Sequence, residues 1–131
     1  MPAKKNNETV SGPGYSKKPD HHVITEEVTV DIEVKAGGVL LSHAQSAILL
    51  TETGYSPVYY LPRSAINFDV LNEISLSTYC PFKGKARYWA ISGDEENIPV
   101  LWGYDDPYSE VKQLSEYAAF YTDRVEFRVT E

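Results

Sequence analysis

Hydrophobic and polar residues alternate along much of the chain, a pattern typical of β-strands with one buried face. In VTVDIEVK, residues 28–35, every second residue is a valine or isoleucine, and a Gly-Gly turn follows at 37–38. The same alternation returns in RVEFRVT, residues 124–130. These two segments therefore predict strands with one face toward a core and one toward solvent.

Four more segments predict strands between these two. VLLSHAQSAILLTE, residues 39–52, predicts two short strands separated by polar residues, and SPVYYLPR, residues 56–63, predicts a strand ended by Pro62. Proline ends it because proline cannot donate to a strand ladder. KARYWAIS and IPVLWGYD, residues 85–92 and 98–105, predict a hairpin joined by the acidic loop GDEEN.

One short helix is predicted after the hairpin. Asp106 suits the N-cap and Pro107 the first helical position, and apolar residues at 111, 114, 117 and 118 fall on one face. Residues 1–21 are polar and offer little to bury, so they are predicted to be a disordered tail. The expected fold is thus a single mainly β, antiparallel domain over residues 22–131, with one helix.

Charge and cysteine content narrow the function classes. The chain carries a formal charge of −7, which disfavours nucleic-acid partners because nonspecific binding needs basic residues. The chain contains neither an apolar run of membrane-spanning length nor a secretory signal, so a soluble cytoplasmic protein without membrane contact is expected. Its one cysteine, Cys80, excludes an internal disulfide and argues against a structural zinc site, and no cofactor is predicted.

Four motifs carry a family resemblance: YYLPR, TYCPFKGKARYW, WGYDDP and AAFYTDRVEF, in this order over about residues 28 to 129. In order and spacing they resemble the domain-of-unknown-function-427 family, whose signature includes T-x-C-P-[YF]-K-G-x-A-x-Y-W. The resemblance implies a β-tent-like fold, in which two antiparallel sheets meet at an angle, here in a branch without zinc. Leu61 stands where the family usually has phenylalanine.

One domain-naming scheme labels this family a nucleotidyltransferase. Such an enzyme needs carboxylates that hold Mg²⁺ against a triphosphate. Asp31 and Glu33 share one face of a predicted strand, as a metal-binding pair would. The residues before them lack a Gly-Ser phosphate turn, so a strand with a solvated polar face is the favoured interpretation of this pair.

Cys80 has three interpretations. It packs in the core, contacts a ligand, or acts as a nucleophile whose thiolate Lys83 or Lys85 stabilises. Packing is favoured, because free cysteine is commonly buried and the chain offers no resolving cysteine.

The aromatic residues predict a binding cleft. Alternation places Tyr88 and Trp89 on opposite faces of their strand, so one of them faces a second sheet, a cleft or solvent. The leading hypothesis is a binding module for a small planar or anionic ligand. The alternatives are an enzyme, either a nucleotidyltransferase or a thiol enzyme at Cys80, and a protein-interaction module; the oligomeric state is left open. The predicted cleft residues are Tyr60, Trp89, Trp102 and Tyr104, with Arg63 and Lys83 as anion contacts and Cys80 at the wall.

Overall fold

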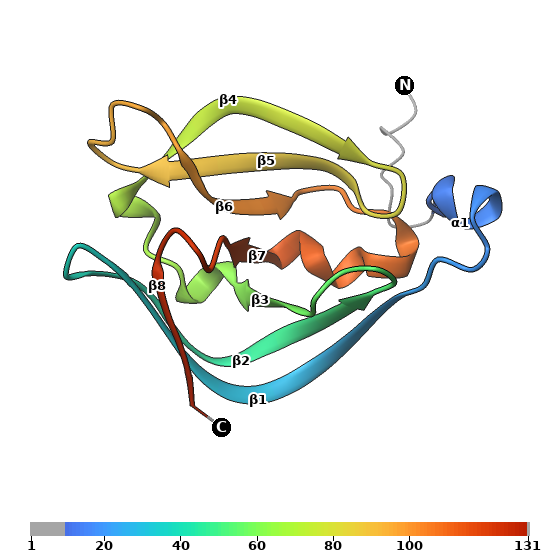
Figure 1. The fold of residues 1–131 in the computed structure, drawn as a ribbon, viewed down its shortest axis with the longest axis horizontal. Helices are drawn as coiled ribbons and strands as arrows, with labels where there is room; N and C mark the ends of the chain where they lie inside the picture. The colour runs from blue at the N-terminus through green and yellow to red at the C-terminus, as the bar shows by residue number, and fades with distance from the viewer. Residues whose placement is uncertain (1–9, 131) are drawn as a thin grey trace, which may run out of the picture.

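A computed structural model describes residues 10–130 and contains eight antiparallel strands, shown in Figure 1. Their bounds are β1 (Val23–Ala36), β2 (Val39–Glu52), β3 (Val58–Pro62), β4 (Leu71–Cys80), β5 (Gly84–Ile91), β6 (Pro99–Tyr104), β7 (Tyr117–Phe120) and β8 (Glu126–Thr130). The helical elements are α1 (Gly14–Lys17) and three short 3₁₀ helices, η2 (Arg63–Ala65), η3 (Phe68–Val70) and η4 (Ser109–Glu116). The mainly β, antiparallel fold class is confirmed.

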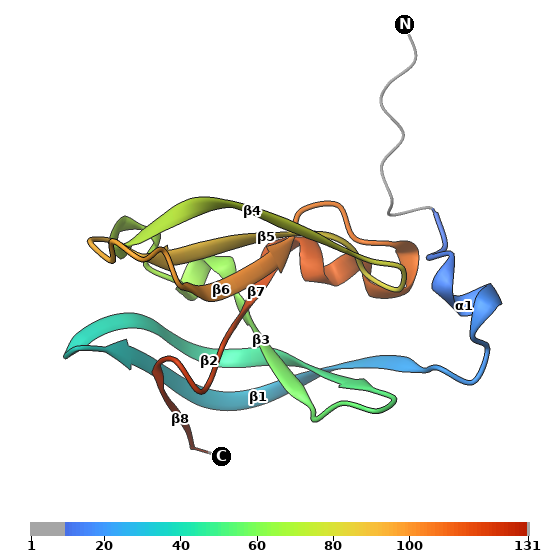
Figure 2. The same ribbon diagram turned by 45° about the horizontal axis from the view of Figure 1, so that its top comes forward.

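The strands form one continuous sheet in the order β4-β5-β6-β7-β3-β2-β1-β8. Figure 2 shows that this sheet folds over, so that β4, β5 and β6 form a layer facing β1 and β2. The two layers are joined where β3 pairs with β7, through Leu61 opposite Ala118 and Pro62 opposite Tyr117. The expectation of two sheets is confirmed only in part, because two facing layers exist but their strands follow one another in a single order.

The hairpin of β1 and β2 corrects one prediction. Gly37 and Gly38 have φ angles of 56° and 81°, which form the predicted turn. The prediction of two short strands over residues 39–52 is wrong, because β2 is one strand of 14 residues. Shifts in its register with β1 let Gln45 and Ser46 point outward, while Ala44 and Ala47 stay buried on either side of them.

The other predicted strands are confirmed. β3 ends at Pro62, β5 and β6 pair as a hairpin, and β8 alternates between half-buried and exposed residues. One strand, β4, carried no clear pattern in the sequence. β4 lies at the sheet edge and is exposed along most of its length, so it shows no hydrophobic alternation.

The predicted helix forms only in part. Val111 and Leu114 are fully buried as expected, but they lie in η4, a 3₁₀ segment with a kink at Val111. Tyr117 and Ala118, predicted on the same helical face, belong to β7 instead. The pairing of Ala118 with Leu61 outweighs the local preference for helix, because it joins the two layers.

The segment before β1 differs from the predicted disordered tail. Residues 1–9 of that tail lie outside the described residues, whereas residues 10–21 contain α1 and pack against the sheet. The Gly14 N–H donates to the Pro81 carbonyl oxygen at 3.0 Å, and a Cβ on Gly14 would lie 2.7 Å from the Phe82 ring. The composition of this segment suggested flexibility, but the absence of a side chain at Gly14 lets the backbone lie close to the Phe82 ring.

Glu110 anchors the same segment. Its carboxylate accepts hydrogen bonds from the Ser11 hydroxyl and from the Gly12 N–H, the latter at 3.0 Å. Burial would raise the pKa of Glu110, but these hydrogen bonds outweigh it and hold the pKa below its ordinary value of 4.5. A carboxylate with a lowered pKa stabilises the docked segment above that ordinary value, and this stabilisation is lost as pH falls through the lowered pKa.

We therefore expect residues around Gly12 to undock at acid pH while the strands remain folded. The measurement is the amide chemical shift of Gly12, followed by NMR as the pH is lowered from neutrality. The Glu110→Gln variant should show the undocked shift already at neutral pH. A Gly12 shift that does not respond to ionisation of Glu110 would contradict this account.

The buried residues form two hydrophobic clusters that share β5. Trp89 packs in a larger cluster with Leu61, Leu101 and Phe120, whereas Tyr88 packs in a second cluster with residues of β2, β3, β6 and η4. Both rings are buried, as their positions on opposite faces of a strand covered on both sides require. The predicted placement of these two residues on opposite faces is confirmed.

Candidate ligand-binding cleft

A cleft runs beside the ends of β2 and β4 and consists of two adjoining hollows. We call them the inner chamber, of about 360 Å³, and the outer chamber, of about 530 Å³. Five predicted site residues line the inner chamber: Tyr60, Cys80, Lys83, Trp102 and Tyr104. Five that the sequence did not single out also line it: Leu50, Glu52, Tyr55, Ser56 and Val58.

Strand alternation explains why these side chains meet. Trp102 and Tyr104 are two residues apart on β6 and so point to the same side, opposite Tyr88 and Ala86 of β5. Cys80 is the last residue of β4, and the tight turn after it brings Lys83 to the same end of the sheet.

The aromatic wall of the inner chamber is held by a hydrogen bond. The Trp102 Nε1–H donates to the Tyr60 hydroxyl at 3.2 Å, and the two rings meet edge to face with centroids 6.0 Å apart. Burial raises the pKa of Tyr60 and that of Tyr104, and for Tyr60 it outweighs the opposing hydrogen bond from Trp102. Both hydroxyls therefore stay protonated, and the Tyr104 hydroxyl is hydrogen-bonded to that of Tyr60.

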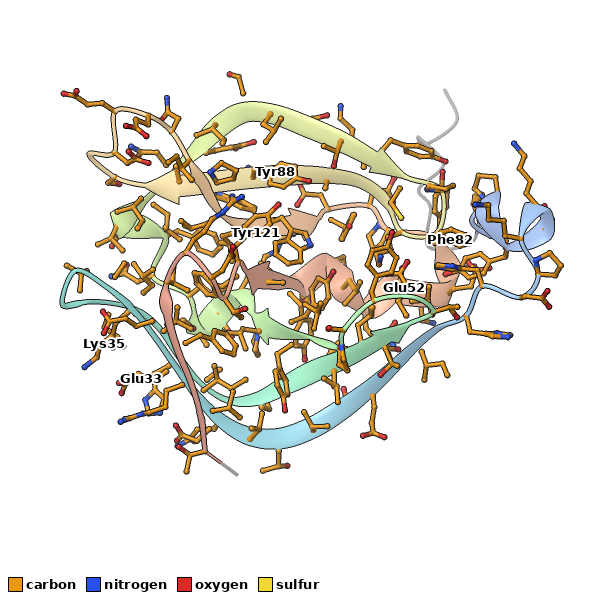
Figure 3. All side chains as sticks on the ribbon, viewed as in Figure 1. Glu33, Lys35, Glu52, Phe82, Tyr88 and Tyr121 are labelled. Atoms are coloured by element: carbon orange, nitrogen blue, oxygen red, sulfur yellow. The ribbon has the colours of Figure 1, made fainter. Side chains whose placement is uncertain are left out.

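An ionic chain closes the other side of the inner chamber. Lys83 Nζ lies 2.5 Å from Glu52 Oε1, and His21 Nε2 lies 2.9 Å from Glu52 Oε2. The three side chains are only 10%, 11% and 16% exposed, in the order Lys83, Glu52 and His21. The His21 ring stacks on Phe82 at 4.0 Å, and Figure 3 shows Glu52 and Phe82 at the end of the molecule that carries α1. The charge of Lys83 is thus paired within the protein.

Cys80 lies where the two chambers adjoin. It is half-buried and lines both of them. Its carbonyl oxygen accepts the Lys83 N–H at 3.2 Å, which helps to fix the turn.

Two of the predicted residues, Trp89 and Arg63, do not line the cleft. Trp89 points to the other face of β5, into the larger cluster, where Arg63 and Arg87 lie over its ring at 5.7 and 4.7 Å. Arg63 also donates to Tyr117 O at 3.0 Å and to Asp105 Oδ1 at 2.7 Å. The same alternation that brings Tyr88 to the cleft side of β5 carries Trp89 away from it.

Asp105 holds Arg63 and Arg87 together. Burial would raise the pKa of Asp105, but hydrogen bonds from Arg63 and Arg87 outweigh this effect and hold the pKa below its ordinary value. Asp105 therefore stays ionised as the link between two arginines that cover Trp89, and this network is separate from the aromatic wall.

The carboxylates considered for metal binding lie elsewhere. Asp31 Oδ1 is 3.0 Å from His43 Nε2, and Glu33 Oε1 is 3.4 Å from Lys35 Nζ and 3.5 Å from Arg128. Figure 3 shows Glu33 and Lys35 on the outer side of β1, at the end opposite to Glu52. Within residues 10–130, no group of three or more His, Cys, Asp or Glu side chains is placed to hold a metal ion.

Glu52 and His21 are two of the polar cleft residues that sequence reasoning missed. A signal for Glu52 exists, since Ile48, Leu50 and Glu52 are spaced by two and so share one face of β2. A carboxylate at the end of a buried apolar stripe requires a partner. His21 carries no such signal, because it lies in a segment whose composition predicts disorder.

The family model described as Domain of unknown function (DUF427) matches residues 24–131. The chain therefore belongs to this family. No curated protein matches the chain. The matched region includes the aromatic wall, Cys80 and Lys83, but it begins after His21.

None of the helices described between residues 10 and 130 has the length and apolar character needed to cross a membrane.

Proposed function

We propose that this protein is a binding module that holds a small planar ligand in the inner chamber. The observation that carries this proposal is the meeting of Trp102, Tyr60 and Tyr104 at one hollow with a buried ion pair on its far side. Pockets for small molecules are typically apolar and aromatic with a few fixed polar groups, and this composition matches them.

The chamber favours a flat ring that also accepts hydrogen bonds. The half-buried Trp102 offers an aromatic face, and its own N–H is already used on Tyr60. The hydroxyls of Tyr60 and Tyr104 are protonated, and the Lys83 ammonium has N–H groups beyond the one that it donates to Glu52. A planar ligand with a carbonyl or carboxylate oxygen would satisfy these donors.

The enzyme alternatives have less support. Asp31 and Glu33 are paired with basic side chains on an outer surface, away from the cleft. Cys80 has no histidine hydrogen-bonded to it within the described residues; His21, which lines the outer chamber with it, is bonded to Glu52. A thiol nucleophile normally needs such a base.

Two probes of similar size test the proposal: indole-3-acetamide, which is flat, and cyclohexaneacetamide, which is not. In ¹⁵N NMR titrations without Mg²⁺, we expect saturable shifts at inner-chamber residues for the flat probe. Trp102→Leu should weaken this binding at least about fivefold, since stacking of a flat ring on an aromatic side chain is worth about 1–3 kcal/mol. Phe127→Leu, a half-buried aromatic of β8 outside both chambers, is the matched control and should bind as the wild type does.

Equal binding of the two probes, or unchanged affinity in Trp102→Leu, would overturn the proposal. A Mg²⁺-dependent response to ATP that is lost in Asp31→Asn, with no response in the inner chamber, would favour nucleotidyl transfer instead.

A further inference from the structure

We infer that the ligand carries a negatively charged substituent that lies in the outer chamber. This inference rests on the proposed binding of a planar ring in the inner chamber and goes beyond it by naming the ligand class: a flat ring with an anionic side group. The carboxylate and phosphate members of this class share the chemistry that the outer chamber would recognise.

The two chambers are arranged for a ligand with two parts. They share Glu52, Tyr55 and Cys80 in their linings, so a substituent on a ring beside Trp102 can extend past the thiol into the outer chamber. The outer chamber is also the larger of the two, at about 530 Å³. A ring alone would leave that space to water.

The charge at the outer chamber favours an anion. Glu52 is its acidic residue, and both carboxylate oxygens of Glu52 already have partners, Lys83 and His21. Lys18 also lines the chamber, and its ammonium forms no ion pair with any residue of the 10–130 range. The chamber and the ion pair behind it therefore carry an excess of positive charge.

This charge stands out on an acidic protein. The chain as a whole carries −7, and a hollow of about 610 Å³ beside β4 is lined by more acidic than basic residues: Glu73, Asp105 and Asp106 against Lys85 and Arg87. An anion is repelled by most of the surface and meets an excess of basic groups at the cleft, which makes charge a selective feature there.

Docking of the segment before β1 places the basic groups. The Tyr15 hydroxyl donates to Phe82 O at 3.0 Å, and the Lys18 N–H donates to Gly14 O at 2.9 Å. His21 stacks on Phe82 as it reaches Glu52. Lys18 and His21 both precede the region that the family model matches, so the charge preference comes from a part of the chain outside that match.

Three probes with one ring separate charge from shape: indole-3-acetate, its neutral isostere indole-3-acetamide, and the cation tryptamine. In NMR titrations at low ionic strength, the acetate should bind about threefold to tenfold more tightly than the amide, as expected for one added charge-assisted contact. Tryptamine should bind most weakly. Lys18→Gln should remove the advantage of the acetate and leave the affinity for the amide unchanged.

Lys17→Gln is the matched control. It changes the net charge of the protein by the same amount at the adjacent position, but Lys17 does not line the outer chamber. This variant should keep the preference for the acetate. An equal loss in both variants would show a general charge effect and overturn the inference.

The outcomes distinguish the two proposals. Equal affinity for the acetate and the amide, with shifts in the inner chamber for both, overturns the anionic substituent and leaves the planar ligand standing. Absence of saturable shifts with all three probes overturns both. To test a phosphate substituent, indol-3-yl phosphate replaces indole-3-acetate. If it binds more tightly than the amide to the wild type but not to Lys18→Gln, the inference is supported in the same way.

Discussion

Glu52→Leu is expected to lower the free energy of unfolding by about 3–5 kcal/mol, because it leaves the Lys83 ammonium buried without its counter-ion. Both side chains of this pair are about nine-tenths buried, so solvent cannot take over the role of the lost carboxylate. The change also removes the acceptor of His21, which should loosen the segment before β1. Urea unfolding followed by tryptophan fluorescence measures the effect.

Two further variants test the physical cause. In Glu52→Leu/Lys83→Met the charge and its partner are both gone, and most of the lost stability should return, since apolar residues often replace a buried ion pair at little cost. Glu73→Gln breaks an exposed pair with Arg87 and should cost less than about 1 kcal/mol. If Glu52→Leu costs no more than Glu73→Gln, the buried pair does not have the role described here.

Leu61→Ala is expected to destabilise the protein by about 2–5 kcal/mol. Leu61 is 0% exposed, packs in the larger cluster, and pairs with Ala118 at the place where β3 joins the two layers of the sheet. Truncation leaves a cavity at this junction, and the layers can close it only by moving relative to each other. The same urea experiment measures the loss.

Leu76→Ala provides the comparison for Leu61. Leu76 is 41% exposed on the edge strand β4, so the same truncation should change stability by less than about 1 kcal/mol. Because Leu61 follows Tyr60 in β3, Leu61→Ala should also weaken probe binding in the inner chamber. Equal costs for the two leucine variants would contradict the assignment of Leu61 to the junction.

The TYCPFKGKARYW motif acts mainly through its turn and through the rings of Tyr88 and Trp89 at its end. Phe82 is buried under Gly14 and His21, and Gly84 has a φ of 116° with its Cα facing the Asp106 carbonyl oxygen. A side chain at Gly84 would meet that oxygen at 3.3 Å and would require a strained backbone. The turn therefore fixes both the docking of α1 and the position of Lys83.

The two rings at the end of the motif, Tyr88 and Trp89, pack in different hydrophobic clusters. Tyr88 forms a hydrogen bond of 2.7 Å with Thr78 on β4 and packs in the cluster behind the cleft, while Trp89 fills the larger cluster. Cys80, at the start of the turn, is neither fully packed nor isolated, since it lines both chambers.

The sequence by itself determined the features that depend on local pattern. Alternation over residues 28–35 and 124–130 identified strands, the Gly-Gly pair identified a turn, and spacing by two on β6 put Trp102 and Tyr104 on one side. These features follow from backbone geometry that each segment adopts wherever it lies, so they are readable without knowing the neighbours.

Only the tertiary structure decided which side chains meet across the sheet. Glu52 contacts Lys83 and His21, each 31 residues away in sequence. Arg63, which was predicted to line the cleft, instead binds Asp105. The docking of residues 10–21 likewise depends on Phe82 and Glu110, which no pattern in that polar segment reveals. Contacts between distant segments are set by how the sheet folds over, and local sequence carries no record of that geometry.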